Sequence, residues 1–342
     1  MSRRTSLALS LAMSLLGASA CDEASFGDGD VALRPGGYGC GGVLLNTSAL
    51  GDWAVPQLST NFGDSLDGLI LEAIEIKSQD KKPVKLEKVW VDNGQIQGMA
   101  NGVTYKAAQL EGSKWFILNK SVGVTRYMTL DKYELDATTK HEYYTFNYPD
   151  DPSYGLFFFN NYIFGGGGTK PDTKTEHNGT PLPVCAPDPV TNDIRTLVAG
   201  NFYIELSTAH VMKADNTITL NCVSGGTGKS YMWGYKPFEV GAEAWEAAIR
   251  VVRADYFGNN ESWTKPGNAL TLKDIWGINT HPSPLGPTEA VWTPKGALCV
   301  GEPRDANFDY FDVEINGVNL PPCKDMILGD FGGEDLLWSA VP

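Results

Sequence analysis

A glycine-rich run at 224–230, Ser-Gly-Gly-Thr-Gly-Lys-Ser, is the first place where residue types and spacing could do chemistry. A phosphate-binding loop requires glycine, any four residues and then Gly-Lys-Ser/Thr, between a strand and a helix. Here Val223 occupies the position of the first glycine, and the following Tyr-Met-Trp at 231–233 favours a strand. We therefore predict a β-hairpin that turns at 224–228 and returns over 230–235, in place of a nucleotide site.

Ser65 is the second candidate, as a nucleophile. It lies in a Gly-Asp-Ser-Leu run that resembles the nucleophile block of a large family of exported esterases and lipases. In that family the histidine of an Asp-x-x-His block takes the serine proton. The residues three positions before His141, His177, His210 and His281 are Thr138, Lys174, Ser207 and Ile278, so none of the four histidines fits. We expect a turn at Ser65, and a secreted hydrolase that uses Ser65 or an acidic pair remains the alternative function.

The cysteine, histidine and acidic residues do not follow the spacing of a metal motif. The histidines are scattered and no two cysteines have Cys-x-x-Cys spacing. Acidic clusters at 28–30, 305–312 and 329–335 could bind Ca²⁺ through carboxylates, but none has the loop spacing of a calcium motif. We expect solvated acidic loops without a cofactor or metal, and a calcium-stabilised adhesion domain is a further alternative.

The N-terminal residues predict export. Two arginines precede an apolar run at 7–16, which closes in Gly-Ala-Ser-Ala before Cys21. This is the pattern of a secretory signal peptide over residues 1–20. Cleavage before a cysteine also resembles the lipobox of bacterial lipoproteins, which makes Cys21 the predicted lipid anchor. Ala18 stands where a lipobox usually has leucine, so simple secretion is the alternative.

Whether the number of available cysteines is odd or even bears on the choice between a lipid anchor and simple secretion, because thiols of exported proteins pair in an oxidising environment. Lipid on Cys21 leaves an odd number of other cysteines, whereas an unmodified Cys21 allows all six to pair. The disulfide candidates are Cys40, Cys185, Cys222, Cys299 and Cys323. Their connectivity does not follow from sequence, and Cys323 could pair with Cys299 or with a cysteine of the N-terminal region.

The composition is that of a folded, acidic protein. Of 342 residues, 42% are hydrophobic and 11% aromatic, which is enough to form a large core. The 41 acidic residues outnumber the 27 basic ones and give a net charge of −14. Nucleic acid and anionic lipid would be repelled by such a surface. We therefore expect membrane contact only through a lipid anchor.

Alternating hydrophobicity and turn signals predict a mainly β (α+β) fold, with antiparallel β-meander or sandwich-like sheets. Asn93-Gly94 and Asn101-Gly102 separate short alternating segments, and Asn-Gly is the strongest short-range hairpin signal. Further strands are expected over 115–118, 143–146, 202–206, 217–223 and 311–315.

Segments rich in glycine and proline indicate where the domains of the chain begin and end. After the signal peptide, the expected division is a polar leader (21–42), an N-terminal β-rich domain (43–164), a Gly/Pro-rich linker or long loop (165–189) and a C-terminal domain (190–342).

One segment has helical periodicity instead. An amphipathic helix is predicted over 241–256, with Gly258 as its stop signal. Its apolar face contains Trp245, Ala248, Ile249, Val252 and Tyr256, and its polar face, expected to point away from the core, contains Glu243, Glu246, Arg250 and Arg253.

Residues 217–304 resemble the ADYC-domain family of exported bacterial proteins. The matching pieces are the strand ending in Cys222, the motif residues Trp233, Gly234, Tyr235 and Pro237, the helix end with Arg253, Ala254, Asp255 and Tyr256, and Trp292 followed by 296–300. The resemblance implies export and an ADYC-like domain within 190–342, but no activity. Because no active site assembles from these residues, we expect a non-catalytic envelope or cell-surface module that binds or scaffolds.

Overall fold

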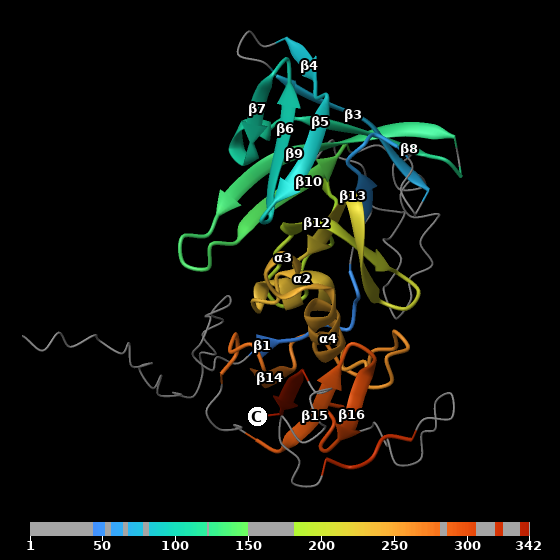
Figure 1. Cartoon of the computed structure of the whole chain (residues 1–342), viewed down its shortest axis with the longest axis vertical. Helices are drawn as coiled ribbons and strands as arrows, with labels where there is room; N and C mark the ends of the chain where they lie inside the picture. Colours follow the sequence, from blue (N-terminus) through green and yellow to red (C-terminus); the bar gives the residue numbers. More distant parts are fainter. Residues whose placement is uncertain are drawn as a thin grey trace, which may run out of the picture. The chain divides into compact units, whose positions relative to one another are not determined.

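The structure is a computed structural model (Figure 1) that describes residues 44–51, 56–63, 68–77, 82–121, 123–149, 181–280, 286–305, 319–323 and 336–341. Over these ranges the chain is mainly β with antiparallel sheets, as predicted, and it contains three α-helices where one was expected. The signal peptide, Cys21, Cys40, Ser65 and the expected strand at 311–315 lie outside the described residues.

The largest sheet has the strand order β2-β13-β12-β10-β9-β8-β3-β4, with β11 paired to β10 beside this path. Its strands are β2 (Gln57–Ser59), β3 (Leu69–Lys77), β4 (Pro83–Lys85), β8 (Lys114–Asn119), β9 (Val124–Leu135), β10 (Glu142–Tyr148), β11 (Leu182–Pro183), β12 (Thr196–Glu205) and β13 (His210–Cys222). Burial alternates along them, so that Trp115 is buried and Phe116 is partly exposed. A single sheet thus contains strands from both 43–164 and 190–342.

A small three-stranded meander consists of β5 (Lys88–Asp92), β6 (Gln95–Ala100) and β7 (Val103–Lys106), followed by the 3-10 helix η1 (Ala107–Leu110). Both predicted Asn-Gly turns are present. Asn93 and Gly94 have φ of 49° and 84°, and Asn101 and Gly102 have φ of 50° and 73°. A type I′ turn needs positive φ at both central residues, which is why Asn-Gly sequences form it.

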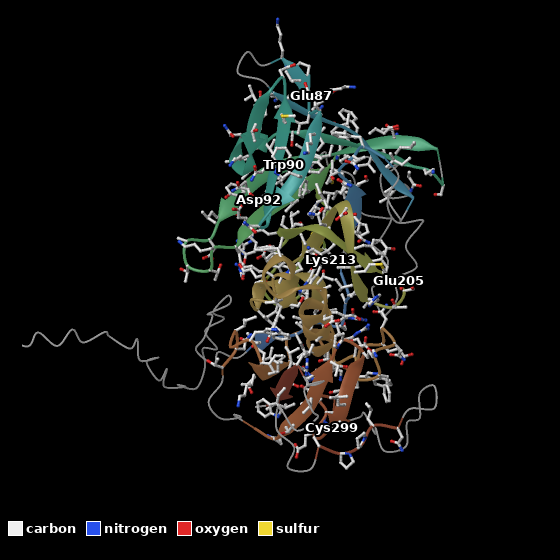
Figure 2. The ribbon with its side chains drawn as sticks, in the orientation of Figure 1. Glu87, Trp90, Asp92, Glu205, Lys213 and Cys299 are labelled. Atoms are coloured by element: carbon white, nitrogen blue, oxygen red, sulfur yellow. A yellow bond between two sulfur atoms is a disulfide. The ribbon has the colours of Figure 1, made fainter. Side chains whose placement is uncertain are left out.

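A five-stranded sheet is formed mostly by the C-terminal part of the chain, in the order β1-β14-β17-β15-β16. Its strands are β1 (Leu44–Leu45), β14 (Ala269–Asp274), β15 (Thr288–Thr293), β16 (Gly296–Val300) and β17 (Leu337–Ala340). Cys299, labelled in Figure 2, lies on β16 at the edge of this sheet.

The helices α2 (Gly226–Met232), α3 (Pro237–Val240) and α4 (Ala242–Arg253) lie between β12–β13 and the five-stranded sheet (Figure 1). The predicted helix is therefore present, but it ends at Arg253, where Ala254 adopts a left-handed conformation with φ of 51°. Gly258 has another role: a Cβ there would lie 1.9 Å from the carbonyl oxygen of Lys295. Within the described ranges, no helix has the length and hydropathy needed to cross a lipid bilayer.

One hydrophobic core joins the three sheets and α4. It includes Ile96 of the small sheet, Trp115 of the large sheet, Trp245 of α4 and Trp292 of the five-stranded sheet. Gly200 allows the small sheet to approach, because a Cβ at that position would lie 2.7 Å from a side-chain carbon of Val91. The inward face of β5 is thereby fixed against β12.

Candidate functional site

The glycine-rich run at 224–230 is a strand-to-helix junction, so the predicted hairpin is wrong. β13 ends at Cys222, α2 begins at Gly226, and residues 230–235 contain no strand. Gly228 brings the helix against the strand end, since a Cβ there would lie 2.1 Å from the carbonyl oxygen of Cys222. This close tertiary packing overrides the local strand preference of residues 231–233.

Lys229 and Ser230 are both engaged inside the protein, which argues against a phosphate site. Lys229 Nζ donates to the carboxylate of Asp188, and both side chains are buried. Burial alone would raise the pKa of Asp188, but the hydrogen bonds from Lys229 and from backbone N–H groups outweigh it, and the pKa lies below its usual value. Ser230 Oγ donates to the carbonyl of Thr227 and accepts from Trp245 Nε1, each at 3.0 Å.

The charged residues at the end of α4 are buried, which corrects the prediction that they point away from the core. Glu246 and Arg250 are only 4% and 2% exposed. Arg250 bridges two carboxylates, with Nη2 3.1 Å from Glu246 Oε1 and Nη1 2.5 Å from Asp255 Oδ2. Asp255 also accepts the backbone N–H groups of Asn259 and Asn260. Glu243 in the first turn is exposed, as predicted, whereas the later turns are covered on one face by apolar contacts and on the other by ion pairs.

Arg253, the first residue of the Arg-Ala-Asp-Tyr run, connects three segments of the chain. Its Nε donates to the carbonyl of Ser48 at 3.1 Å, and its Nη2 donates to the carbonyl of Asn260 at 2.8 Å. Its Nη1 also bonds the side-chain oxygen of Asn260. Burial lowers the pKa of Arg253 to about 10, so the guanidinium remains charged at neutral pH. The charged residues here fix the loop that follows the helix.

Tyr256 belongs to a second buried polar cluster. Its hydroxyl donates to Glu289 Oε1 at 2.8 Å, and its ring stacks on Trp292 at a centroid distance of 5.2 Å. Ser339 Oγ donates to Glu289 Oε2 at 2.7 Å. Arg304 pairs with the same carboxylate through Nε at 2.5 Å and bonds two carbonyls in the last turn of α4 through its Nη groups. Neither Glu289 nor Arg304 could be identified from the sequence, because neither lies in a periodic segment with its partners.

The motif residues 233–237 form a turn between α2 and α3. Tyr235 donates its hydroxyl to Asp274 Oδ2 at 2.9 Å and accepts from Asn279 Nδ2 at 3.1 Å. Gly234 has φ of 102°, and Pro237 begins α3. Trp233 contributes its carbonyl as a second acceptor for Asn279. Residues 233–237 and residues 253–256 thus have the same role, which is to join helix ends to the strands and loops around them.

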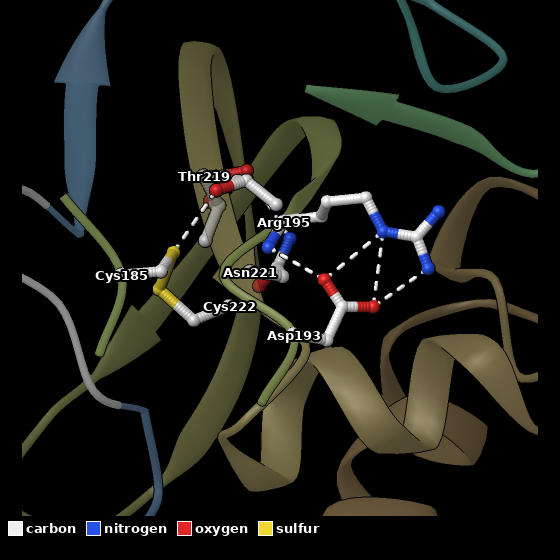
Figure 3. The surroundings of a disulfide bond; sticks show 7 residues. Cys185, Asp193, Arg195, Thr219, Asn221 and Cys222 are labelled. Atoms are coloured by element: carbon white, nitrogen blue, oxygen red, sulfur yellow. Dashed lines mark hydrogen bonds and ion pairs between the residues drawn. A yellow bond between two sulfur atoms is a disulfide. The ribbon is translucent and has the colours of Figure 1, made fainter. Parts of the chain in front are cut away.

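Two disulfides form among the candidate cysteines, and one of them settles the pairing left open for Cys323. Cys185 bonds Cys222, and Cys299 bonds Cys323. Figure 3 shows the first bond beside Asp193 and Arg195, whose carboxylate and guanidinium are hydrogen-bonded to each other. The first disulfide fastens the segment before β12 to the end of β13, and the second fastens β16 to the 319–323 segment.

His210 and His141 are the two histidines within the described residues, and they differ in their surroundings. His210 is largely exposed, and its Nδ1 lies 2.8 Å from the buried carboxylate of Glu246. Glu246 also accepts the N–H of Val211 at 3.0 Å. This pair was not anticipated from the sequence, because Glu246 was assigned to the solvent face of α4. His141 is only 1% exposed and lies edge-on to Tyr143.

Acid should destabilise the protein through His141. Burial, with a further contribution from Lys236, lowers the pKa of this imidazole from 6.5 to about 4. The unfolded chain therefore binds more protons than the folded one between these values, so the free energy of unfolding decreases as the pH is lowered through this window. Lowering the pH from 7 to 4 should cost about 3 kcal/mol of unfolding free energy at this residue, measurable by urea unfolding at each pH.

The matched variant is His141→Gln, which retains a polar side chain but cannot titrate. Its unfolding free energy should fall by about 3 kcal/mol less than that of the wild type over the same pH range. The same pH dependence in both proteins would show that His141 does not control acid stability.

Metal binding has no support within the described part of the chain, where no three His, Cys, Asp or Glu residues are grouped to hold an ion. The acidic clusters at 28–30 and 329–335, and all of 305–312 except residue 305, lie outside that part.

The comparisons with known proteins agree with the motif described above. The ADYC domain model matches residues 169–306, which include α2, α3, α4 and the Cys185–Cys222 disulfide. No curated protein and no solved structure matches the chain. Residues 169–306 therefore constitute an ADYC domain, and the Arg-Ala-Asp-Tyr run at 253–256 lies where the helix ends and its buried polar clusters begin.

Proposed function

We propose that the protein is an exported, non-catalytic module of the cell envelope or surface that binds or scaffolds a partner, and that a lipid on Cys21 anchors it. The observation that carries this proposal is the internal use of the polar groups of the motif. Lys229, Arg250, Arg253 and Arg304 each bond a carboxylate, amide or carbonyl of the protein itself. A catalytic acid, base or nucleophile must instead be able to reach a substrate.

The two disulfides support the extracytoplasmic part of the proposal. Disulfides persist in oxidising compartments and are rare in the cytosol. The pairs Cys185–Cys222 and Cys299–Cys323 use four of the six cysteines in the sequence. With lipid on Cys21, the proposal leaves Cys40 as the remaining thiol.

The experiment is intact-mass analysis of the mature protein isolated from its native host, with alkylation before and after reduction. We expect a chain that begins at Cys21 and carries a diacylglyceryl group, one thiol that alkylates without reduction, and recovery in the membrane fraction. Cys21→Ser is the matched variant and should move the protein to the soluble fraction. An unmodified Cys21 oxidised together with Cys40 would contradict the anchor.

Absence of catalysis is checked on the same preparation with a panel of short-chain ester substrates. Wild type and Ser65→Ala should both remain at the background rate. A wild-type rate that is lost in Ser65→Ala would replace this proposal with the hydrolase alternative.

A further inference from the structure

The turn that follows β14 presents two apolar side chains to solvent. Within the described ranges, the exposed large hydrophobic residues are Val103, Leu135, Val190, Met212, Ile275 and Trp276. Of these, Ile275 and Trp276 alone are consecutive in the sequence, and they are 53% and 36% exposed. Single exposed apolar residues are normal on protein surfaces, so the adjacent pair is the one that requires an explanation. We name residues 273–280 the β14 turn.

Hydrogen bonds hold the β14 turn in one conformation. The buried carboxylate of Asp274 accepts the backbone N–H groups of Trp276 at 2.8 Å and of Asn279 at 2.6 Å. An antiparallel bridge between Lys273 and Thr280 closes the turn at its base. The backbone at the tip is thus already ordered before it meets a partner, which lowers the entropic cost of binding.

The motif of the ADYC domain supports the same turn through Trp233 and Tyr235. The hydroxyl of Tyr235 donates to Asp274, and its ring lies edge-on to the indole of Trp276, with 6.2 Å between the ring centroids. The Trp233 carbonyl and the Tyr235 hydroxyl both accept hydrogen bonds from Asn279. The indole of Trp276 is therefore positioned by the domain and still remains partly open to solvent.

The accessible charge of the β14 turn is opposite to that of the whole chain. The chain has a net charge of −14, but Asp274, the acidic residue of this turn, is buried and hydrogen-bonded, whereas Lys273 is exposed. Indole rings favour the boundary between the acyl chains and the headgroups of a bilayer, and a lysine beside them can reach lipid phosphate. An exposed tryptophan and isoleucine next to an exposed lysine therefore match the surface of a phospholipid bilayer.

The path of the chain brings this turn within reach of the membrane in which the proposed anchor is inserted. Residues 22–43 separate Cys21 from β1, and a fully extended stretch of this length spans up to about 75 Å. β1 pairs with the start of β14, where Leu44 is the partner of Leu270 (Figure 1). Ile275 follows five residues later, about 17 Å further along an extended strand. The lipid and the turn can therefore contact the same bilayer.

We infer that the β14 turn is a second membrane contact, at which Ile275 and Trp276 insert among the headgroups of a phospholipid bilayer and Lys273 binds lipid phosphate. The turn does not replace the lipid, because burial of two side chains gives only weak and reversible membrane binding. It instead sets the orientation of the module, since two points of attachment fix an orientation that one point does not. This inference rests on the proposed anchor and specifies which surface of the domain faces the membrane.

The test holds the protein at a membrane whether or not Cys21 carries a lipid. The mature Cys21→Ser chain with an N-terminal hexahistidine tag is captured on vesicles of phosphatidylcholine and a nickel-chelating lipid. Its tryptophan fluorescence is compared between vesicles with ordinary and with dibrominated acyl chains, because bromine quenches the tryptophans that are inserted in the bilayer. We expect extra quenching by the dibrominated lipid, and Trp276→Phe should lose most of it. Trp90→Phe is the matched control, because Trp90 is partly exposed on β5, and it should keep the extra quenching.

Further variants and the possible results separate this contact from the anchor. Ile275→Ser should weaken insertion roughly tenfold and lower the extra quenching as well. Trp276→Phe keeps an aromatic ring beside Tyr235, so its circular dichroism should match the wild type. Equal quenching in both kinds of vesicle, or undiminished extra quenching in Trp276→Phe, would overturn the membrane contact and leave the exposed pair to a protein partner. The mass analysis of Cys21 does not depend on this result, so failure of the turn and failure of the anchor are distinguishable.

Discussion

Arg304→Met should lower the free energy of unfolding by roughly 3–5 kcal/mol, because it leaves a buried carboxylate without its cation. The side chains of Arg304 and Glu289 are both 0% exposed, and their closest N–O distance is 2.5 Å. The same guanidinium bonds the carbonyls of Val251 and Val252. The substitution therefore uncaps the C-terminal turn of α4 as well as breaking the ion pair. Unfolding in guanidinium chloride, followed by tryptophan fluorescence, measures the loss.

An exposed pair provides the matched control. Lys265 and Asp305 are separated by 4.0 Å, and the Lys265 side chain is 71% exposed. Exposed pairs contribute about 0–1 kcal/mol, so Lys265→Met should change stability by less than about 1 kcal/mol. A similarly small effect of Arg304→Met would show that its burial and pairing do not hold the ADYC domain together.

A double substitution separates the ion pair from the rest of the site. If the charge left on Glu289 causes most of the loss, Arg304→Met combined with Glu289→Gln should be less destabilised than the sum of the two single variants. Simple additivity would instead assign the loss to the carbonyl contacts of Arg304 and to packing.

The local sequence was sufficient to predict those elements whose structure depends mainly on local conformation. The Asn93-Gly94 and Asn101-Gly102 turns follow from the positive φ that these residues tolerate, and the sequence pattern located both. The apolar period of 241–256 likewise located α4, because four of its apolar positions contribute to one buried face.

Predictions from the sequence were wrong where contacts between distant parts of the chain determine the structure. The run at 224–230 resembles a turn, but α2 forms there because Gly228 allows the helix to lie directly against the end of β13. Glu246 and Arg250 were assigned to solvent, since charged residues on a helix usually face water. Their partners Asp255 and His210 become visible only in the fold. Polar burial of this kind depends on tertiary contacts that no periodic pattern encodes.

The motif of the ADYC domain illustrates the same limit at the level of function. Its residues could be identified from the sequence, but the sequence does not show whether their side chains face a substrate or bond to each other. In the structure Asp255 accepts three hydrogen bonds from within the domain, and Tyr235 contacts Asp274 and Asn279.

Replacing both Cys185 and Cys222 with alanine should lower the free energy of unfolding by about 4 kcal/mol, the value expected when a loop of this length is no longer closed in the unfolded chain. The two cysteines are 37 residues apart, and both are buried. A loss of this size is a large part of the roughly 5–15 kcal/mol that usually stabilises a domain.

The second disulfide is the matched comparison, since Cys299 and Cys323 are 24 residues apart and their replacement should cost slightly less, about 3.5 kcal/mol. Both losses are measured by denaturant unfolding of oxidised protein, and reducing agent should destabilise the wild type without affecting a variant that lacks both bonds. Equal stability of oxidised and reduced wild type would contradict the prediction. If the losses are found, the fold depends on covalent bonds that a reducing cytosol does not maintain, and its stability is then matched to an oxidising compartment.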